Sequence, residues 1–124
     1  MLELRHLDPS HPFQAQLQGP DDGQPITLVN TFVAPEGQAE EVIDIWRHDA
    51  LYMKAQPGFV EAQLYRGIGD CHVLTNVAVW ESLTALRNAF MTDEFQSMLS
   101  RYPDGAVAHP VAVHKQAVPG VCVG

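Results

Sequence analysis

The segment Cys71–Ser82 constrains the fold of this chain more than any other, because its side chains alternate between a plain apolar set and a mixed set. The first set is Val73, Thr75, Val77 and Val79, and the second is His72, Leu74, Asn76, Ala78 and Trp80. Successive side chains of a strand point to opposite faces, so the segment is predicted to be a strand with two different faces. A face built only for packing has no need of an amide and an indole. The asparagine and the tryptophan therefore mark a candidate ligand-binding face.

The flanking segments predict a β-hairpin and a helix. Phe59–Ile68 is a second predicted strand, and Gly67–Asp70 supplies the turn that joins the two strands. Ser82 is a favourable N-cap residue, so a helix is expected to begin directly after the second strand. Its apolar pattern pauses at 92–94 and resumes as far as Tyr102, which indicates a break followed by a second helical segment.

The preceding part of the chain predicts one strand and one long helix. Ile26–Val33 alternates like the hairpin strands. A helix is expected to follow, with Pro35 at or near its first position. It is expected to run to about Ala55 and to stop at 56–58. Apolar residues recur along this helix every three or four positions, and Asp49 is the single polar residue in that stripe.

The predicted element order, β-α-β-β-α-β, is that of the ferredoxin-like fold in the α+β class. Its final strand spans 106–118, where Pro110 favours an edge or a bulge. This order predicts one antiparallel sheet with two helices on one face. Because the strands are apolar on both faces, the second sheet face also needs cover. A homodimer in which two sheets close against each other, as a dimeric α+β barrel, would provide that cover.

The composition divides the chain into three parts. Residues 25–118 form the predicted domain, an extension over 1–24 precedes it, and a tail over 119–124 follows it. Prolines, glycines and the turn sequence Asp21-Asp22-Gly23 punctuate the extension. The extension is expected either to form an arm that lies across a partner subunit or to be a loosely ordered terminus.

Charge and cysteine content narrow the expected partners and compartment. Fifteen acidic residues against seven basic ones give a formal net charge of −8. Phosphate backbones and anionic membrane surfaces repel such a chain, so neither nucleic acid nor a membrane is expected as a partner. No apolar run is long enough to cross a bilayer, and the first residues lack the pattern of a signal peptide. Cys71 and Cys122 are far apart in sequence and are predicted to be free thiols in a reducing cytoplasm, with a disulfide between them as the alternative.

Three sequence segments carry a family resemblance. They are Ile26–Val33, Pro57-Gly58-Phe59, and Thr75–Leu83 with its Asn-x-x-x-Trp-Glu-Ser motif. Together they resemble the antibiotic biosynthesis monooxygenase family over residues 26 to about 117, with the same element order. The resemblance implies a dimeric α+β barrel. The family includes cofactor-independent oxygenases that oxidise polycyclic phenols to quinones, haem-degrading enzymes and members of unknown role.

The resemblance also implies roles for single residues. Asn76 and Trp80 match the asparagine and the tryptophan that line the pocket of the quinone-forming members. Asn30 matches the first-strand asparagine of the haem-degrading members. Leu99 stands where that branch has its iron-binding histidine, and Ala89 stands where it has a second pocket tryptophan. The resemblance therefore implies no haem, and the quinone-forming branch implies no cofactor.

The match to the phenol-oxidising branch is incomplete. That branch has tyrosines at the positions of Leu64 and Leu86. Tyr65 is adjacent to the first of these, but a shift of one residue along a strand turns a side chain to the opposite face. The polar frame is thus kept in part, without the hydroxyls that would hold a substrate.

The candidate catalytic residues are Asn30, Asn76, Trp80 and His72. The two amides and the indole N–H are donors for an oxyanion that develops on a bound phenol. His72 lies on the same predicted face as Asn76, and imidazole is the side-chain group suited to general base catalysis near neutral pH, so His72 is the candidate general base. The predicted apolar walls of the pocket are Leu28, Phe32, Leu74, Leu86, Phe90 and Leu99. The remaining histidines lack the spacing of a metal site.

Each of these residues also has a structural interpretation. A buried asparagine can bond a neighbouring backbone group, a buried tryptophan can be core, and His72 at a strand start can be exposed. Two functions therefore remain open. The first is a cofactor-independent monooxygenase, a cytoplasmic homodimer that oxidises a planar aromatic phenol or quinol with O2. The second is a non-catalytic dimer of the same fold that binds a small ligand or serves in a stress response.

Overall fold

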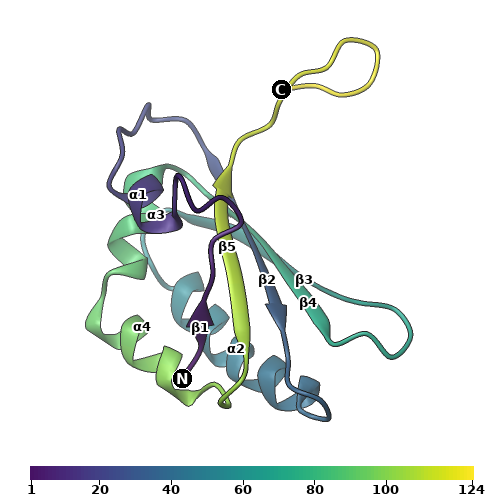
Figure 1. Cartoon of the computed structure of the whole chain (residues 1–124). Coiled ribbons are helices and arrows are strands. Elements are labelled where there is room, and N and C mark those ends of the chain that lie inside the picture. The colour runs from purple at the N-terminus through teal and green to yellow at the C-terminus, as the bar shows by residue number, and fades with distance from the viewer.

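A five-stranded sheet with helices on one face forms the protein, and this computed structural model describes residues 1–124 (Figure 1). The strands are β1 (Glu3–Leu4), β2 (Ile26–Val33), β3 (Phe59–Arg66), β4 (Val73–Trp80) and β5 (Val107–Val113). The helices are α1 (Phe13–Leu17), α2 (Ala39–Lys54), α3 (Leu83–Phe90), α4 (Asp93–Met98) and the short 3-10 helix η1 (Leu99–Arg101). The spatial order is β1-β5-β2-β4-β3, with β1 parallel to β5 and all other neighbours antiparallel. The predicted ferredoxin-like α+β fold is confirmed, with β1 added at one edge.

Strand β5 ends earlier than its sequence pattern predicts. Its last pair with β2 joins Val113 to Thr27, and β2 itself begins at Ile26, so residues beyond 113 have no strand to pair with. Pro110 lies beyond the two residues of β5 that pair with β1. The side of β5 that faces β1 is therefore unpaired at Pro110. A proline, which has no backbone N–H, costs the sheet no hydrogen bond there.

The helical segment after β4 is broken where the sequence predicts a break. Ser82 Oγ accepts a hydrogen bond from the backbone N–H of Ala85 at 3.2 Å and caps α3. Thr92 Oγ1 accepts one from the N–H of Phe95 at 3.3 Å and caps α4. Two separately capped helices thus stand in place of one long helix.

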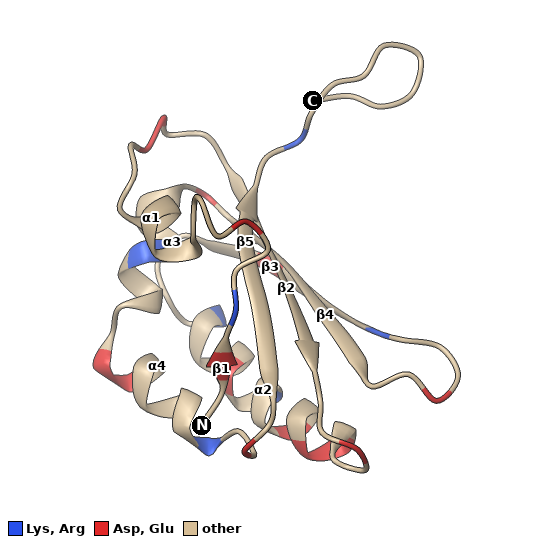
Figure 2. Cartoon of the chain, in the orientation of Figure 1, with Lys and Arg blue, Asp and Glu red and all other residues tan.

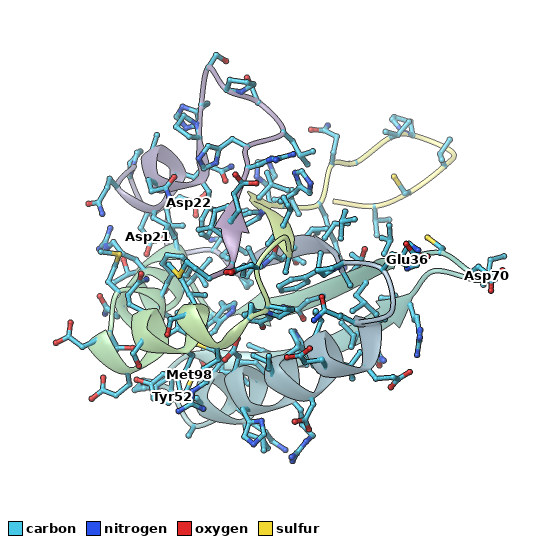
Figure 3. The ribbon with its side chains drawn as sticks, turned by 60° about the horizontal axis from the view of Figure 1, so that its bottom comes forward. Asp21, Asp22, Glu36, Tyr52, Asp70 and Met98 are labelled. Atoms are coloured by element: carbon cyan, nitrogen blue, oxygen red, sulfur yellow. The ribbon has the colours of Figure 1, made fainter.

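Helix α2 begins later than predicted and packs against α4. Gly37 adopts a φ of 76°, in the left-handed region, so helical geometry begins only at Ala39. Near the other end of α2, the Tyr52 hydroxyl donates to Thr92 Oγ1 at 2.9 Å. Figure 3 shows Tyr52 close to Met98, at the place where α2 and α4 meet.

The N-terminal extension packs against its own domain. Its buried side chains are Leu2, Phe13 and Leu17. The Gln16 side chain donates to the backbone oxygen of Ala112 and accepts from its N–H, each at 2.9 Å. Asp21 accepts a hydrogen bond from the N–H of Thr84, in the first turn of α3, at 2.9 Å (Figure 3). This ordered packing corrects the expectation of a loosely ordered terminus.

The two faces of the sheet differ in cover. The inner face, toward the helices, carries Leu28, Phe32, Leu74, Ala78, Trp80 and Ala108, all part of the buried core. The outer face of β2, β4 and β5 carries partly buried valines and threonines, namely Thr27, Val29, Thr31, Val73, Thr75, Val77, Val79, Val107 and Val111. The same face also carries His109 on β5 and Glu61, Gln63 and Tyr65 on β3. No helix covers this outer face (Figure 1).

The remaining surface is acidic, and the chain ends in a projecting tail. Acidic residues are spread over helices and loops, with few basic residues between them (Figure 2). Residues 114–124 extend away from the domain (Figure 1), and Val121 and Val123 in this tail are exposed. Cys71 and Cys122 are exposed and unpaired. None of the helices combines the length and the apolarity that a membrane span requires.

Candidate functional site

A cavity of about 60 Å³ lies between the inner sheet face and the helices. Sixteen of its twenty lining residues are hydrophobic. The wall includes residues of β2, β4, α2, α3, α4 and η1, together with Leu2, Leu4 and Phe13 from the N-terminal extension. Pockets that bury a drug-sized ligand typically measure about 300–1,000 Å³. The cavity is therefore small and mostly apolar, and any polar atom in its wall stands out.

Four lining residues each carry a buried polar atom that has no hydrogen-bond partner. The atoms are Asn30 Oδ1, Asp49 Oδ1, Asn76 Oδ1 and Trp80 Nε1. No other buried side-chain nitrogen or oxygen in the molecule lacks a partner. An unsatisfied buried polar group costs about 1–3 kcal/mol, and folded proteins contain few of them. Their concentration around one cavity indicates a site whose polar partners come from a bound molecule.

The sheet fixes the positions of three of these groups. Asn30 and Asn76 are directly opposite each other in the antiparallel pair of β2 and β4. Cβ atoms of such a pair are about 4.5–5.5 Å apart, so the two amides form one polar patch. Trp80 lies four residues beyond Asn76 on the same face and is 1% exposed. The ring of Phe59 packs edge-on against the indole, with 5.4 Å between centroids, and fixes its orientation.

The fourth group comes from the helical side of the cavity. Asp49, on α2, accepts a hydrogen bond at Oδ2 from the Tyr102 hydroxyl at 2.6 Å, while its Oδ1 remains unpartnered. Burial raises the pKa of the Asp49 carboxyl to about 6, and the Tyr102 hydrogen bond and the charges of Arg101 and His48 only partly oppose this. Burial also raises the pKa of Tyr102, and the Asp49 charge adds to that effect. The pair is thus a carboxyl group that changes protonation state close to neutral pH beside a neutral phenol.

The sequence model of the antibiotic biosynthesis monooxygenase family matches residues 25–101, more than half of the chain. The chain belongs to this family. Its fold is similar to that of SnoaB, a cofactor-independent oxygenase from Streptomyces nogalater, at 23% identity and a TM-score of 0.70. That match covers 78% of this chain and 98% of SnoaB.

Two further solved structures extend the comparison. A protein of Shewanella loihica PV-4, assigned as a candidate monooxygenase, is 26% identical with a TM-score of 0.66, over 81% of this chain and all of that one. A conserved protein of Methanosarcina mazei Go1 is 15% identical with a TM-score of 0.65, over 84% of this chain and all of that one. No curated protein sequence matches the chain.

Most of the residues predicted for the site border the cavity. They are Asn30, Asn76, Trp80, Leu28, Phe32, Phe90 and Leu99. Leu74 and Leu86 are buried in the core but are not part of the cavity wall. His72 is exposed in the turn before β4, next to a surface depression that it shares with Arg66 and Glu40. His72 is therefore not positioned to act as a base on a ligand in the cavity.

Several cavity residues of this family member were not predicted for the site. The sequence marks Asp49, because this residue is the polar one in the apolar stripe of α2. No local sequence pattern shows that it contacts Tyr102. Trp46, an apolar residue of the same helical stripe, also lines the cavity. Leu4 and Phe13 come from outside the matched region 25–101, so the family pattern does not reveal them.

The donor set of the cavity suits an organic ligand. Its lining residues include one carboxylate and no histidine or cysteine, and nowhere in the structure do three or more metal-binding side chains gather. Zinc and haem iron are held by nitrogen or sulfur ligands in most protein sites. The unpartnered groups are instead three oxygen acceptors and one N–H donor. A hydroxylated aromatic molecule matches both the apolar wall and these groups.

Proposed function

We propose that the protein is a cofactor-independent monooxygenase that oxidises a small planar phenol or quinol with O2. The observation that carries this proposal is the set of four unpartnered polar atoms, from Asn30, Asp49, Asn76 and Trp80, in the wall of one apolar cavity. Membership of the family and the similarity to SnoaB, a cofactor-independent oxygenase, support the same reaction class.

The reaction uses the substrate as its own reductant. A phenol with a reactive ring C–H combines with O2 to give a quinone and one water. One oxygen atom enters the ring, the other leaves as water, and the substrate supplies all four electrons. Ionising the phenol makes it electron-rich enough to pass an electron to O2. The protein therefore has to favour the phenolate and keep bulk water away from the intermediates.

The named side chains provide these functions. The Trp80 Nε1–H is a donor for the phenolate oxygen or for a peroxide that forms on the ring, and the amides of Asn30 and Asn76 orient the ligand on the sheet. The apolar wall lowers the local dielectric constant, which strengthens each of these polar contacts. These roles require no metal or organic cofactor.

Ligand entry requires the wall to move. A cavity of about 60 Å³ is smaller than the roughly 150 Å³ engineered cavity that holds benzene in another protein. The N-terminal extension supplies Leu2, Leu4 and Phe13 to the wall and is outside the family match, so its displacement would enlarge the cavity without opening the sheet. We therefore propose a substrate of one or two rings, smaller than the polycyclic phenols that the sequence resemblance implied.

The functional unit that we propose is a homodimer. The outer face presents a central band of valines and threonines, including the cross-strand pair Val29–Val77, and no part of the chain covers this band. A second copy with its own outer face would bury this surface and close the dimeric α+β barrel. Two exposed free thiols, Cys71 and Cys122, suit a reducing cytoplasm.

Oxygen consumption tests the proposed reaction. An oxygen electrode with a panel of one- and two-ring phenols and quinols should record uptake above the rate of spontaneous oxidation. Trp80→Phe keeps an aromatic ring but removes the N–H, and we expect it to lower that rate at least tenfold. Tyr65→Phe is the control, because it also removes a donor from an aromatic side chain but at an exposed position outside the cavity wall, and its rate should stay within about twofold of wild type. Equal rates for both variants and wild type would contradict the proposal.

A second function is favoured by the apolar character of Leu64 and Leu86. These leucines occupy the positions at which the sequence resemblance implied substrate-holding tyrosines, and Leu86 is fully buried. A protein that binds a hydroxylated aromatic molecule without oxidising it would keep the four polar groups and dispense with those hydroxyls. Saturable phenol binding with no oxygen uptake from any panel member would select this binding function.

A further inference from the structure

We propose that Asp49 accepts the proton of a phenolic hydroxyl bound in the cavity, and that Tyr102 is the positioning residue that holds its carboxylate. This inference rests on the proposed function, because it names the group that ionises the substrate. It replaces His72, which is exposed and outside the cavity wall, with a residue inside the wall.

The geometry leaves one carboxylate oxygen free for a ligand. Asp49 is 6% exposed, and its Oδ2 is engaged by the Tyr102 hydroxyl at 2.6 Å. Its Oδ1 is buried and accepts no hydrogen bond from the protein. Asp49 lies on α2, whereas Asn30 and Asn76 lie on the sheet, so a ligand between them meets the carboxylate on one side and the amides on the other.

The surroundings of Asp49 offer no competing base in the cavity. The other lining residues from β2, β4, β5, α2, α3, α4 and the N-terminal extension have no ionisable side chain, and Tyr102 is the remaining titratable member of the wall. Outside the wall, the charges of Arg101 and His48 act on the carboxyl and favour its ionised form. With a pKa of about 6, Asp49 is mostly ionised at neutral pH yet is a stronger base than an exposed aspartate.

A purely structural role would not require a carboxylate. An asparagine at position 49 would keep an oxygen that accepts the Tyr102 hydrogen bond, and it would avoid the desolvation of a buried charge. The carboxylate therefore adds a capacity that the contact between α2 and Tyr102 does not use, namely the capacity to hold a proton.

Asp49 alone can accept and return all the protons that move in the proposed reaction. The phenol O–H bond breaks, the proton moves to Asp49 Oδ1, and the electron pair stays on the phenolate oxygen. One electron then passes to O2, and the two radicals combine to form a ring peroxide anion. Protonated Asp49 returns its proton to the peroxide and then accepts the proton of the ring C–H. The O–O bond breaks as the quinone forms, and hydroxide takes the proton from Asp49 and leaves as water.

The test measures ligand binding in the absence of O2. The probe is 4-methylphenol, which stays neutral in solution from pH 4.5 to 8, and its methyl ether, 4-methylanisole, is the matched ligand without a donor. A hydrogen bond to a charged acceptor is about twice as strong as one to a neutral acceptor. We therefore expect the affinity of the wild-type protein for 4-methylphenol to rise about tenfold between pH 5 and pH 7, with a midpoint near 6. The affinity for 4-methylanisole should not change over this range.

Two variants assign the effect to the proposed residues. Asp49→Asn should bind 4-methylphenol with an affinity that does not depend on pH. Tyr102→Phe keeps the carboxylate but removes the hydrogen bond that lowers the pKa of Asp49, so its midpoint should move to higher pH. Should Asp49→Asn fail to fold, the Tyr102→Phe midpoint decides the question, because a merely structural role would not shift it.

Any one of four results would overturn the assignment. They are a flat pH dependence in the wild-type protein, a pH dependence that persists in Asp49→Asn, an unmoved midpoint in Tyr102→Phe, and no binding of 4-methylphenol at any pH. Failure of the proposed oxygenase function gives a different outcome. In that case binding depends on pH as described, and no oxygen is consumed when air is admitted.

Discussion

At the scale of single residues, Asp49 is the most unusual group in the molecule. It is the one charged residue in the buried set, and burial raises the pKa of its carboxyl from 3.8 to about 6. Because the folded-state pKa is above the unfolded-state value, the folded protein holds the proton more tightly. The residue therefore contributes most to stability when protonated, and that contribution is lost as pH rises through about 4 to 6.

This sign gives a prediction for the Asp49→Asn variant. Relative to wild type, its free energy of unfolding should rise between pH 4 and pH 6 and stay constant above pH 7. A shift of about 2.2 pKa units corresponds to a total change of roughly 3 kcal/mol. Urea unfolding of both proteins at pH 4.5 and pH 7.5 measures it. If the free energies of unfolding of the two proteins differ by the same amount at both pH values, burial does not destabilise the ionised carboxyl of Asp49.

At the scale of elements, the entry into β3 depends on a glycine that touches α3. Gly58 has a φ of 88°, and a side-chain carbon built there would overlap the Cβ of Ala85. The backbone oxygen of Gly58 also accepts a hydrogen bond from the N–H of Glu81 at 2.8 Å, just before α3 begins. The Pro-Gly-Phe segment thus sets how closely α3 approaches the sheet, and hence the shape of the cavity wall near Trp80.

Gly58→Ala should therefore destabilise the protein more than an equivalent change elsewhere. The matched control is Gly69→Ala, which has a φ of 70° but meets no atom within 4 Å. Both variants carry the strain of a left-handed alanine, about 1–2 kcal/mol, and only Gly58→Ala adds steric overlap, worth about 1–3 kcal/mol more. Thermal unfolding of the two variants side by side measures this difference. Equal melting temperatures would mean that α3 moves aside at no energetic cost.

The elements also show what the sequence could predict. Strands β2, β3 and β4, the cap Ser82 and the helix break at Thr92 are local patterns, and the structure has them where the sequence indicated. The start of α2 was wrong because the backbone conformation of Gly37 was not visible in an apolar pattern. The role of the N-terminal extension depends on contacts with residues about 100 positions away, such as the one between Gln16 and Ala112, and no local pattern carries that information.

The same distinction between local patterns and contacts of distant residues applies to the candidate site. Asn30, Asn76 and Trp80 were predictable because they are polar groups on alternating strand faces. Asp49 was visible as an exception in a helical stripe, but its partner Tyr102 is 53 residues away in the chain. His72 shows the limit of the alternation argument, since it precedes the first paired residue of β4 and is exposed.

At the scale of the whole molecule, the uncovered outer face predicts association. Light scattering after size exclusion should give about twice the chain mass of 13.7 kDa. Val77, in the middle of the outer face, pairs with Val29 on one side and Gln63 on the other. Val77→Lys should therefore produce a monomer, because it places an ammonium in an apolar interface. Val60→Lys, at an exposed valine in the bulge of β3 beside α2, should leave the mass unchanged. A wild-type monomer would contradict the proposed dimer.

The short strand β1 has a consequence for how the sheet can grow. It pairs with only two residues of β5, so this border of the sheet consists of a very short strand and the unpaired part of β5 with Pro110, whereas β3 leaves the opposite border unpaired along its whole length. A long unpaired strand can accept a strand from another molecule, whereas very short edge strands and edge prolines hinder such pairing. The border formed by β1 and Pro110 is therefore the less favourable of the two for adding a further strand.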